Sequence, residues 1–259
     1  MTGATRDDAF LGGRLVLRQP ALGYRAGADA VMLAAACPVR PGQSVLELGC
    51  GVGAALFCLG ARVPGLELTG VERQPALADL ARHNAAATGI AARIVTADLA
   101  DLPEGLRNAA FDHVLANPPF FGPGTKAPDD SRAASRHEET PLEVWIDVAL
   151  RRLAPRGWLT LIHRAEALDR ILTALSGRAG AVTILPVAPR VGRPAGRIIV
   201  AARKGARAPL RLLAPFILHE KQLHDADGED LTLAAQAVLR HAAAINLNCD
   251  DSGDRPVLL

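Results

Sequence analysis

The sequence predicts an α/β fold: a Rossmann-like, mostly parallel sheet of seven strands with helices on both faces, preceded by a short N-terminal hairpin and helix. Short apolar runs bounded by glycine, proline and polar residues alternate along the chain with longer helical segments. Such alternation is typical of β-α units, whose right-handed crossovers make neighbouring strands parallel. Apolar residues form 49% of the 259-residue chain and charged residues 22%, which supports a full core and excludes wholesale disorder.

Each element follows from its local residues. A hairpin is expected at residues 10–17, turning at Gly12-Gly13, and a helix at residues 29–36. Pro155 and Gly157 are expected to end the third helix of the alternating region. The seven expected strands are residues 44–48, 66–72, 92–97, 111–116, 158–163, 181–187 and 197–202. The helices expected between them are residues 54–62, 75–88, 141–153 and 166–175.

The length fits one large domain with additions at its ends. Residues 41–205 contain the alternating pattern and form the expected central domain. Residues 1–40 form the N-terminal hairpin and helix extension. Residues 206–259 form a C-terminal strand, helix and acidic tail that we expect to pack on the same domain. The polar stretch 122–140 predicts a long exposed loop.

Composition predicts a cytoplasmic protein with reduced thiols. The formal net charge is only +2, and no apolar run reaches the length of about 18 residues that a membrane span needs. The first eight residues include two acids and no apolar stretch, which argues against a secretory leader. The four cysteines form no Cys-x-x-Cys pair and the histidines do not cluster, so no metal site is expected.

The clearest motif follows the first strand of the expected sheet. Residues 45–53 read Val-Leu-Glu-Leu-Gly-Cys-Gly-Val-Gly, so a strand leads into a turn with Gly49, Gly51 and Gly53 and then into a helix. Glycines let a ligand approach the backbone closely, and the helix start offers unpaired N–H groups. The spacing differs from the Gly-x-Gly-x-x-Gly of pyrophosphate-binding turns, which argues against an NAD-type dehydrogenase.

Acidic residues follow the next two strands. Glu72 ends the second strand, close to the offset of about 20 residues at which an acid meets ribose hydroxyls in nucleotide-binding folds. Its carboxylate only accepts hydrogen bonds at neutral pH, which suits a ribose diol. Asp98, after the third strand, could accept from an adenine amine. The alternative is that Glu72 is a surface acid at a strand end.

A rigid turn, Asn117-Pro118-Pro119-Phe120, follows the fourth strand. Its prolines fix φ and remove backbone donors, so the turn offers acceptors only. A planar amine could donate to the Asn117 side-chain oxygen and the Pro118 carbonyl, while Phe120 offers a face for stacking. A tight turn that merely ends a strand is the alternative. Its place beside the strand with the glycine turn favours a binding site.

In this order the motifs resemble the class I S-adenosylmethionine-dependent methyltransferases of the amino type, over about residues 10–205. The opening residues narrow the resemblance to the bacterial enzymes that methylate N6 of adenine 37 in the anticodon loop of a valine tRNA. They are Asp8 to Gly13, Gln19-Pro20, Tyr24 to Gly27 and Asp29-Ala30. The resemblance implies that residues 41–205 form the methyltransferase domain, with S-adenosylmethionine as methyl donor, S-adenosylhomocysteine as product and no metal.

The resemblance also implies residue roles. Glu47 and the glycines would lie along the methionine part of the cofactor, Glu72 on its ribose and Asp98 on its adenine. Asn117 and Pro118 would hold the target amine, with Phe120 stacked on the base. The implied cofactor-binding residues are Glu47, Gly49, Gly51, Gly53, Glu72, Asp98 and Asn117. The implied catalytic residues are Asn117, Pro118, Pro119 and Phe120.

A basic stretch indicates a nucleic-acid partner. Residues 170–219 carry nine basic residues and no acid, so the segment cannot neutralise itself. We therefore expect Arg190, Arg193 and Arg197 to contact the phosphates of a tRNA. Residues 220–259 carry eight acids against three bases.

Three other functions remain open. Guanine N2 in ribosomal RNA and N5 of a protein glutamine are planar amines that the same turn could hold, although the basic stretch favours RNA over protein. A catalytically silent RNA-binding module is the non-enzyme alternative. The intact Asn117 and Glu72 argue against it, because a silent copy has no reason to keep both acceptors.

Overall fold

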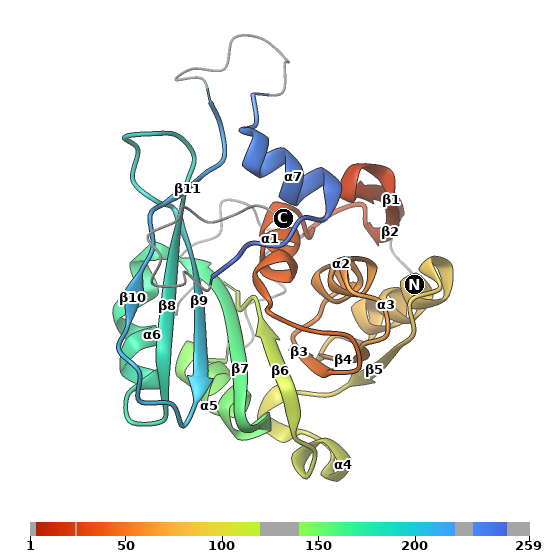
Figure 1. Ribbon diagram of the computed structural model, residues 1–259. Coiled ribbons are helices and arrows are strands. Elements are labelled where there is room, and N and C mark those ends of the chain that lie inside the picture. Colours follow the sequence, from red (N-terminus) through yellow and green to blue (C-terminus); the bar gives the residue numbers. More distant parts are fainter. Residues whose placement is uncertain (1–3, 24, 120–139, 221–229, 248–259) are drawn as a thin grey trace.

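The computed structural model describes residues 4–23, 25–119, 140–220 and 230–247. A twisted central sheet lies between two layers of helices (Figure 1). The strands run in the order β5-β4-β3-β6-β7-β9-β8-β10, and β11 also pairs with β8. Their bounds are β3 Ser44–Leu48, β4 Glu67–Glu72, β5 Ala92–Thr96, β6 Phe111–Ala116, β7 Leu153–Arg164, β8 Ala179–Ala188, β9 Arg197–Lys204, β10 Arg211–Leu212 and β11 Phe216–Ile217.

This architecture confirms the predicted Rossmann-like sheet. All seven expected strands are present, and the two-residue strands β10 and β11 extend the sheet along β8. β9 runs antiparallel to both β7 and β8, while the other pairs in the sheet are parallel. Because β7 and β8 both oppose β9, the carboxyl ends of β3, β4, β5, β6, β7 and β8 share one edge of the sheet.

Helices cover both faces, as expected. α1, α2 and α3 pack on one face around Leu56, Leu33 and Ile162, and α5 and α6 pack on the other around Leu46 and Ile146. The helical bounds are α1 Ala28–Ala36, α2 Ala54–Arg62, α3 Pro75–Thr88, η2 Leu99–Asp101, α4 Glu104–Arg107, α5 Leu142–Arg152, η4 Ala165–Ala167, α6 Leu168–Leu175 and α7 Leu233–His241. The two apolar layers hold the sheet rigid, so residues at its edge have fixed relative positions.

One boundary differs clearly from the sequence prediction. β7 begins at Leu153, so Pro155 and Gly157 lie inside a strand rather than in a break. Arg156 has a φ of 64°, and the register with β6 shifts between Phe111 and His113. A bulge of this kind tolerates both residues at the start of a strand. The expected loop 122–140 lies outside the described residues except for Thr140.

The N-terminal extension is longer than the expected hairpin. β1 (Thr5–Phe10) and β2 (Leu15–Pro20) pair antiparallel through the turn η1 (Leu11–Gly13), as a sheet of their own. At the other end of the described chain, α7 packs against η1 and α1 (Figure 1). Within the described ranges, no helix combines the length and the apolar character that crossing a bilayer requires.

Candidate active site

The glycine turn joins β3 to α2 at the carboxyl edge of the sheet. Gly49, Gly51 and Gly53 all have positive φ, at 63°, 54° and 83°, a conformation that L side chains rarely adopt. The N–H of Cys50 donates to the Val71 carbonyl of β4 at 2.9 Å, which fixes the turn to the neighbouring strand. The three glycines that the sequence singled out are therefore required by the backbone path.

The three glycines differ in what surrounds them. A Cβ on Gly49 would overlap the ring of Trp145, and one on Gly53 would overlap the ring of Phe57. A Cβ on Gly51 would meet no atom of the described chain within 4 Å. Gly49 and Gly53 thus serve packing, whereas Gly51 leaves one face of the turn open for a ligand to approach.

Glu72 lies beneath this turn, not on the surface. Its side chain is 6% exposed, and Oε2 accepts the N–H of Gly51 at 2.9 Å while Oε1 accepts the N–H of Gln74 at 2.7 Å. Because Glu72 ends β4 and pairs in register with Thr96 of β5, its carboxylate is held at the sheet edge. This finding excludes a simple surface acid.

Glu47 is a second buried carboxylate near the turn. Its Oε2 accepts the N–H of Leu56, in the first turn of α2, at 3.0 Å, and the residue is 3% exposed. Burial raises the pKa of Glu47 to about 8; the Leu56 N–H opposes this and the nearby Glu72 adds to it. The Glu47 carboxyl therefore keeps its proton to a higher pH than an exposed glutamate does.

Asp98 lies two residues beyond β5, at the same edge. Its Oδ1 accepts the N–H of Ala100 at 2.9 Å, and so it caps the short helix η2. The residue is half-buried. One carboxylate oxygen is thus used by the backbone, and the predicted contact with an adenine amine would fall to the other.

Asn117 follows β6 directly. The parallel register pairs Leu48 of β3 with Ala116 of β6 and with Val71 of β4. Consequently Gly49, Glu72 and Asn117 each lie at or just beyond this row of three paired residues. Asn117 is half-buried, Pro118 is buried and Pro119 is exposed, while Phe120 lies outside the described residues. The sheet thus brings the glycine turn and the Asn-Pro-Pro turn together on adjacent strands.

A residue that the sequence analysis missed connects the hairpin to the site. Asn84 of α3 is fully buried; its Oδ1 accepts the Arg18 N–H at 2.8 Å, and its Nδ2 donates to the carbonyls of Arg18 and Val52, both at 3.0 Å. Val52 belongs to the glycine turn. Asn84 shares the buried face of α3 with Ala78 and Ala81, at a spacing of three residues. In the sequence, an asparagine at the helical spacing of two buried alanines could have indicated a buried hydrogen-bonding residue.

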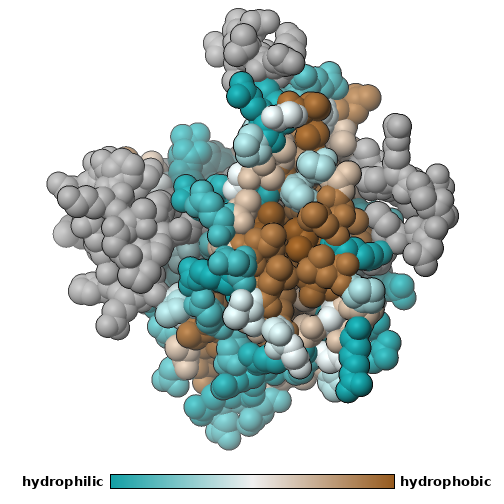
Figure 2. Space-filling model, turned by 90° about the vertical axis from the view of Figure 1, so that its left-hand side faces the viewer, coloured by the Kyte–Doolittle hydropathy of each residue, from teal (hydrophilic) through white to brown (hydrophobic). Residues whose placement is uncertain are grey.

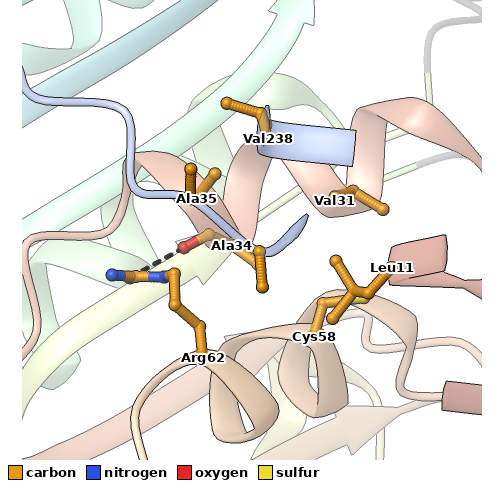
Figure 3. A pocket seen from close by; sticks show the side chains of 9 residues that line it. Leu11, Val31, Ala34, Ala35, Cys58, Arg62 and Val238 are labelled. Atoms are coloured by element: carbon orange, nitrogen blue, oxygen red, sulfur yellow. Dashed lines mark hydrogen bonds between the residues drawn. The ribbon is translucent and has the colours of Figure 1, made fainter. Parts of the chain in front are cut away.

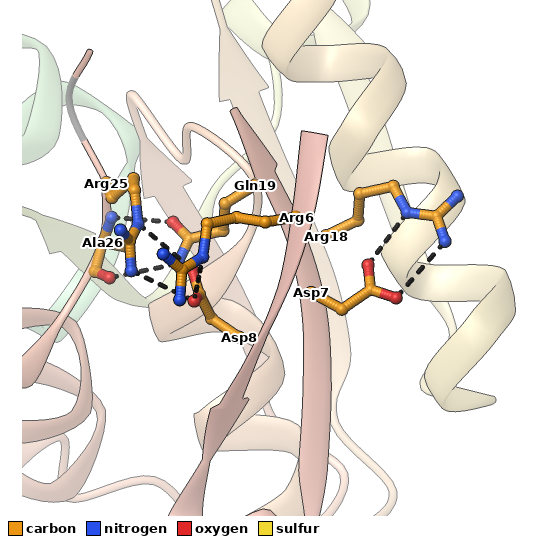
Figure 4. Close-up of polar contacts among 7 residues, drawn as sticks. All are labelled: Arg6, Asp7, Asp8, Arg18, Gln19, Arg25 and Ala26. Atoms are coloured by element: carbon orange, nitrogen blue, oxygen red, sulfur yellow. Dashed lines mark hydrogen bonds and ion pairs between the residues drawn. The ribbon is translucent and has the colours of Figure 1, made fainter. Parts of the chain in front are cut away.

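The segment between the hairpin and α1 is fixed by polar contacts (Figure 4). Asp8, only 12% exposed, pairs with Arg6 at 2.9 Å and with Arg25 at 3.0 Å. Gln19 is buried, accepts the Ala26 N–H at 2.8 Å and donates to Asp8 at 2.9 Å. The start of α1 is therefore tied to the hairpin that packs beside the glycine turn.

The structure changes the interpretation of the basic stretch. Arg190 pairs with Asp230 at 2.9 Å, and Arg197 pairs with Asp29 at 3.0 Å, so both are neutralised by acids from outside residues 170–219. Arg193 is exposed. The sequence could not show this, because the partners are 40 and 168 residues away along the chain. Of the three predicted phosphate contacts, Arg193 alone is exposed.

Two hollows are lined by residues other than those of the glycine and Asn-Pro-Pro turns. One, among α1, α2 and α7, is lined by residues such as Leu11, Cys58 and Val238 and has no room for a water molecule (Figure 3). Arg62 crosses it to donate to the Ala34 and Cys37 carbonyls at the end of α1. The other, about 270 Å³, lies between α5 and α6. Among the described side chains no group of three or more His, Cys, Asp and Glu is placed to hold a metal ion.

Comparison with known proteins identifies the family. The family model described as methyltransferase small domain matches residues 27–178. A tRNA1(Val) (adenine(37)-N6)-methyltransferase of Porphyromonas gingivalis is 39% identical over 170 residues, which cover 62% of this chain and 67% of that protein. A protein of the same name from Dickeya chrysanthemi is 28% identical over 218 residues, or 82% of this chain and 86% of its own.

Solved structures show the same fold. A predicted O-methyltransferase, protein Atu636 of Agrobacterium tumefaciens, is 30% identical with a TM-score of 0.66, covering 81% of this chain and 94% of its own. The T. thermophilus 16S rRNA N2 G1207 methyltransferase, in complex with AdoMet and guanosine, is 22% identical with a TM-score of 0.54. It covers 78% of this chain and 50% of its own.

The sheet order, the glycine turn and the acid beneath it define an S-adenosylmethionine-dependent methyltransferase of the Rossmann-like class. The chain belongs to the methyltransferase small domain family. The residues present fit the cofactor: Gly51 offers an open backbone face, and the carboxylates of Glu72 and Glu47 are buried beside the same turn.

Proposed function

We propose that this chain methylates N6 of an adenine in the anticodon loop of a tRNA. The observation that carries the proposal is the register that places Asn117 and Pro118 of the β6 turn beside the glycine turn of β3. The P. gingivalis and D. chrysanthemi relatives carry this activity in their names. We also propose, from the resemblance, that Glu47 and the glycines hold the methionine part of the cofactor, Glu72 its ribose and Asp98 its adenine.

The difficulty of the reaction lies in the nucleophile. The lone pair of an adenine amine is delocalised into its ring, so the amine attacks weakly. When bound, S-adenosylmethionine supplies a methyl group on a sulfonium sulfur, which is already an excellent electrophile. The Asn117 side-chain oxygen and the Pro118 carbonyl would accept the two amine hydrogens and hold the lone pair out of conjugation. Alignment of the two reactants then supplies much of the remaining acceleration.

The proline turn suits this role physically. Pro118 and Pro119 have no N–H, so no donor of the turn competes with the amine for the two acceptors. The buried Pro118 also restricts the backbone of Asn117, which keeps the acceptor in place without a large entropy cost. An anticodon-loop base is unpaired, so bringing it to the turn costs less than extracting it from a duplex.

The test is identification of the product. The purified chain is incubated with labelled S-adenosylmethionine and an unmodified valine tRNA transcript, and the digested nucleosides are separated by mass spectrometry. We expect N6-methyladenosine from the native transcript and none from a transcript in which guanosine replaces adenosine 37. A product of N2-methylguanosine, or label in a protein glutamine instead of in RNA, would overturn the proposal.

A further inference from the structure

We propose that the loop between β8 and β9, residues 189–196, is a pre-formed RNA-docking element whose tip residues Val191 and Arg193 contact the anticodon stem-loop close to the target base. This inference rests on the proposed function and deepens it, because it assigns substrate recognition to two residues outside the catalytic turn. It also reassigns Arg190 and Arg197 from phosphate contacts to anchors of the loop.

The loop lies at the edge of the sheet that carries the site. β8 and β7 both run antiparallel to β9, and β7 is parallel to β6, so β8 ends and β9 begins at the edge where Asn117 follows β6. In the strand order, β9 is two strands from β6 and β8 is three. At about 4.8 Å per strand, β9 and β8 lie about 10–15 Å to the side of β6. The register puts Asn117 level with Ile199 and Leu185, so the loop begins three to four residues further along the strands, or about 10–13 Å at about 3.3 Å per residue. The two ends of the loop therefore lie about 14–20 Å from the Asn117 turn, which is within the span of one RNA stem-loop.

Both ends of the loop are anchored to distant parts of the chain. At one end Arg190, with a side chain 11% exposed, pairs with Asp230, which is 6% exposed and also contacts His219 Nδ1 at 2.7 Å. The N–H of His219 donates to the Pro189 carbonyl at 2.9 Å. At the other end Arg197 pairs with Asp29 in the first turn of α1. A loop that only connected two adjacent strands would not need these anchors.

The tip is shaped to present its side chains outward. The N–H of Arg193 donates to the Arg190 carbonyl at 3.1 Å, and Gly192 between them has a φ of 75°, so residues 190–193 form a tight turn. Val191 is 78% exposed and Arg193 is exposed. Arg193 suits a phosphate, and Val191 suits the face of an unpaired base. A loop already held in its binding shape loses little conformational entropy on contact with RNA.

The first experiment compares two arginines of equal charge at opposite edges. Arg193→Ala should raise the KM for the anticodon stem-loop about tenfold and flatten the salt dependence of binding by about 0.7 log units per log unit of salt, the effect of one lost phosphate contact. Its kcat and its affinity for S-adenosylhomocysteine should stay parental. Arg207→Ala is the matched control, because Arg207 is exposed and lies beyond β9, which ends at the opposite edge.

The second experiment separates an anchored loop from a general basic patch. Asp230→Asn removes an acid, so a patch acting only through net charge would bind RNA more tightly. An anchored loop predicts weaker binding, because Arg190 loses its partner; circular dichroism confirms that the variant is folded. Val191→Ser should also raise the KM without changing the charge.

The inference would be overturned if Arg193→Ala and Arg207→Ala changed the KM and the salt dependence of binding to the same extent. It would also be overturned if Arg193→Ala weakened the use of full-length tRNA but not of the isolated stem-loop. Either result leaves N6-methylation by the parent chain intact. Failure of the proposed function would instead appear in the product of the parent chain.

Discussion

The carboxylate of Glu72 at the end of β4 accepts the N–H of Gly51 in the turn after β3, at 2.9 Å. One acid thus holds the turn in the shape that leaves the outer face of Gly51 open. A residue predicted to bind ribose therefore has a second role in the fold. The two roles can be measured separately, because loss of the turn contact would lower the free energy of unfolding and loss of a ribose contact would weaken cofactor binding.

Replacing Glu72 with alanine should show both effects. Loss of the hydrogen bonds to the Gly51 and Gln74 N–H groups should lower the free energy of unfolding by about 1–3 kcal/mol. The Kd for S-adenosylhomocysteine, measured by calorimetry, should rise by about 10–100-fold, as expected when a charge-assisted hydrogen bond is lost. Glu67→Ala, at the exposed opposite end of β4, is the control and should change neither quantity. An unchanged Kd in the Glu72 variant would limit this residue to its turn contact.

Alanine at Gly49 and at Gly51 should separate packing from ligand contact. Both residues have positive φ, so both variants share a backbone strain of about 1–2 kcal/mol. The Gly49 variant also forces a methyl group against the Trp145 ring, which adds about 1–3 kcal/mol and should give the lower melting temperature. The Gly51 variant should have a higher melting temperature than the Gly49 variant, yet it should bind S-adenosylhomocysteine more weakly than the parent chain does. A Gly51 variant with parental affinity would show that no ligand approaches this face.

The central sheet could be predicted because its signals are local. The apolar runs at residues 44–48 and 111–116 and the helical segments between strands each follow from a few neighbouring residues. The glycine turn could be predicted for the same reason. A backbone with positive φ at three positions favours glycine at each of them, so Gly49, Gly51 and Gly53 are visible in the sequence itself. Parallel strands then determine which turns share an edge, and so the approximate place of Asn117 and Glu72 follows from order alone.

What the sequence could not show depends on contacts between distant residues. Arg197 lies in a stretch without acids, yet it pairs with Asp29, which is 168 residues away along the chain. The hydrogen bond that Glu72 accepts from Gly51 also depends on the folded turn, because Gly51 is 21 residues away along the chain. β7 extends back to Leu153 because its pairing with β6 tolerates a bulge at Pro155 and Gly157, which local rules treat as breaks.

Glu47 should make stability fall with pH between about 4.5 and 8. Burial raises its pKa to about 8, so between these values the folded state keeps a proton that the unfolded state has lost. The contribution is fully present below the unfolded pKa and is lost as pH rises towards 8, at up to about 1.4 kcal/mol per pH unit. Glu47→Gln keeps an acceptor for the Leu56 N–H but cannot ionise. Urea unfolding from pH 5 to 9 should therefore show a flatter profile for the variant, with a stability gain at pH 9. Parallel profiles for the two proteins would mean that Glu47 is already ionised near pH 5.

Asn117 provides the sharpest test of the chemistry. Alanine at this position removes one of the two proposed acceptors for the target amine but leaves the Glu72 contact with Gly51 and the capping role of Asp98 in place. Single-turnover methyl transfer to an unmodified tRNA should slow by about 10²–10³-fold, comparable with deletion of one positioned transition-state partner. The affinity for S-adenosylhomocysteine should change little. Asn117→Asp is the matched control, because its carboxylate still accepts a hydrogen from the amine, so it should retain more activity than the alanine variant. Transfer at the parental rate by the alanine variant would reject amine activation at this turn, even though the methyltransferase fold would stand.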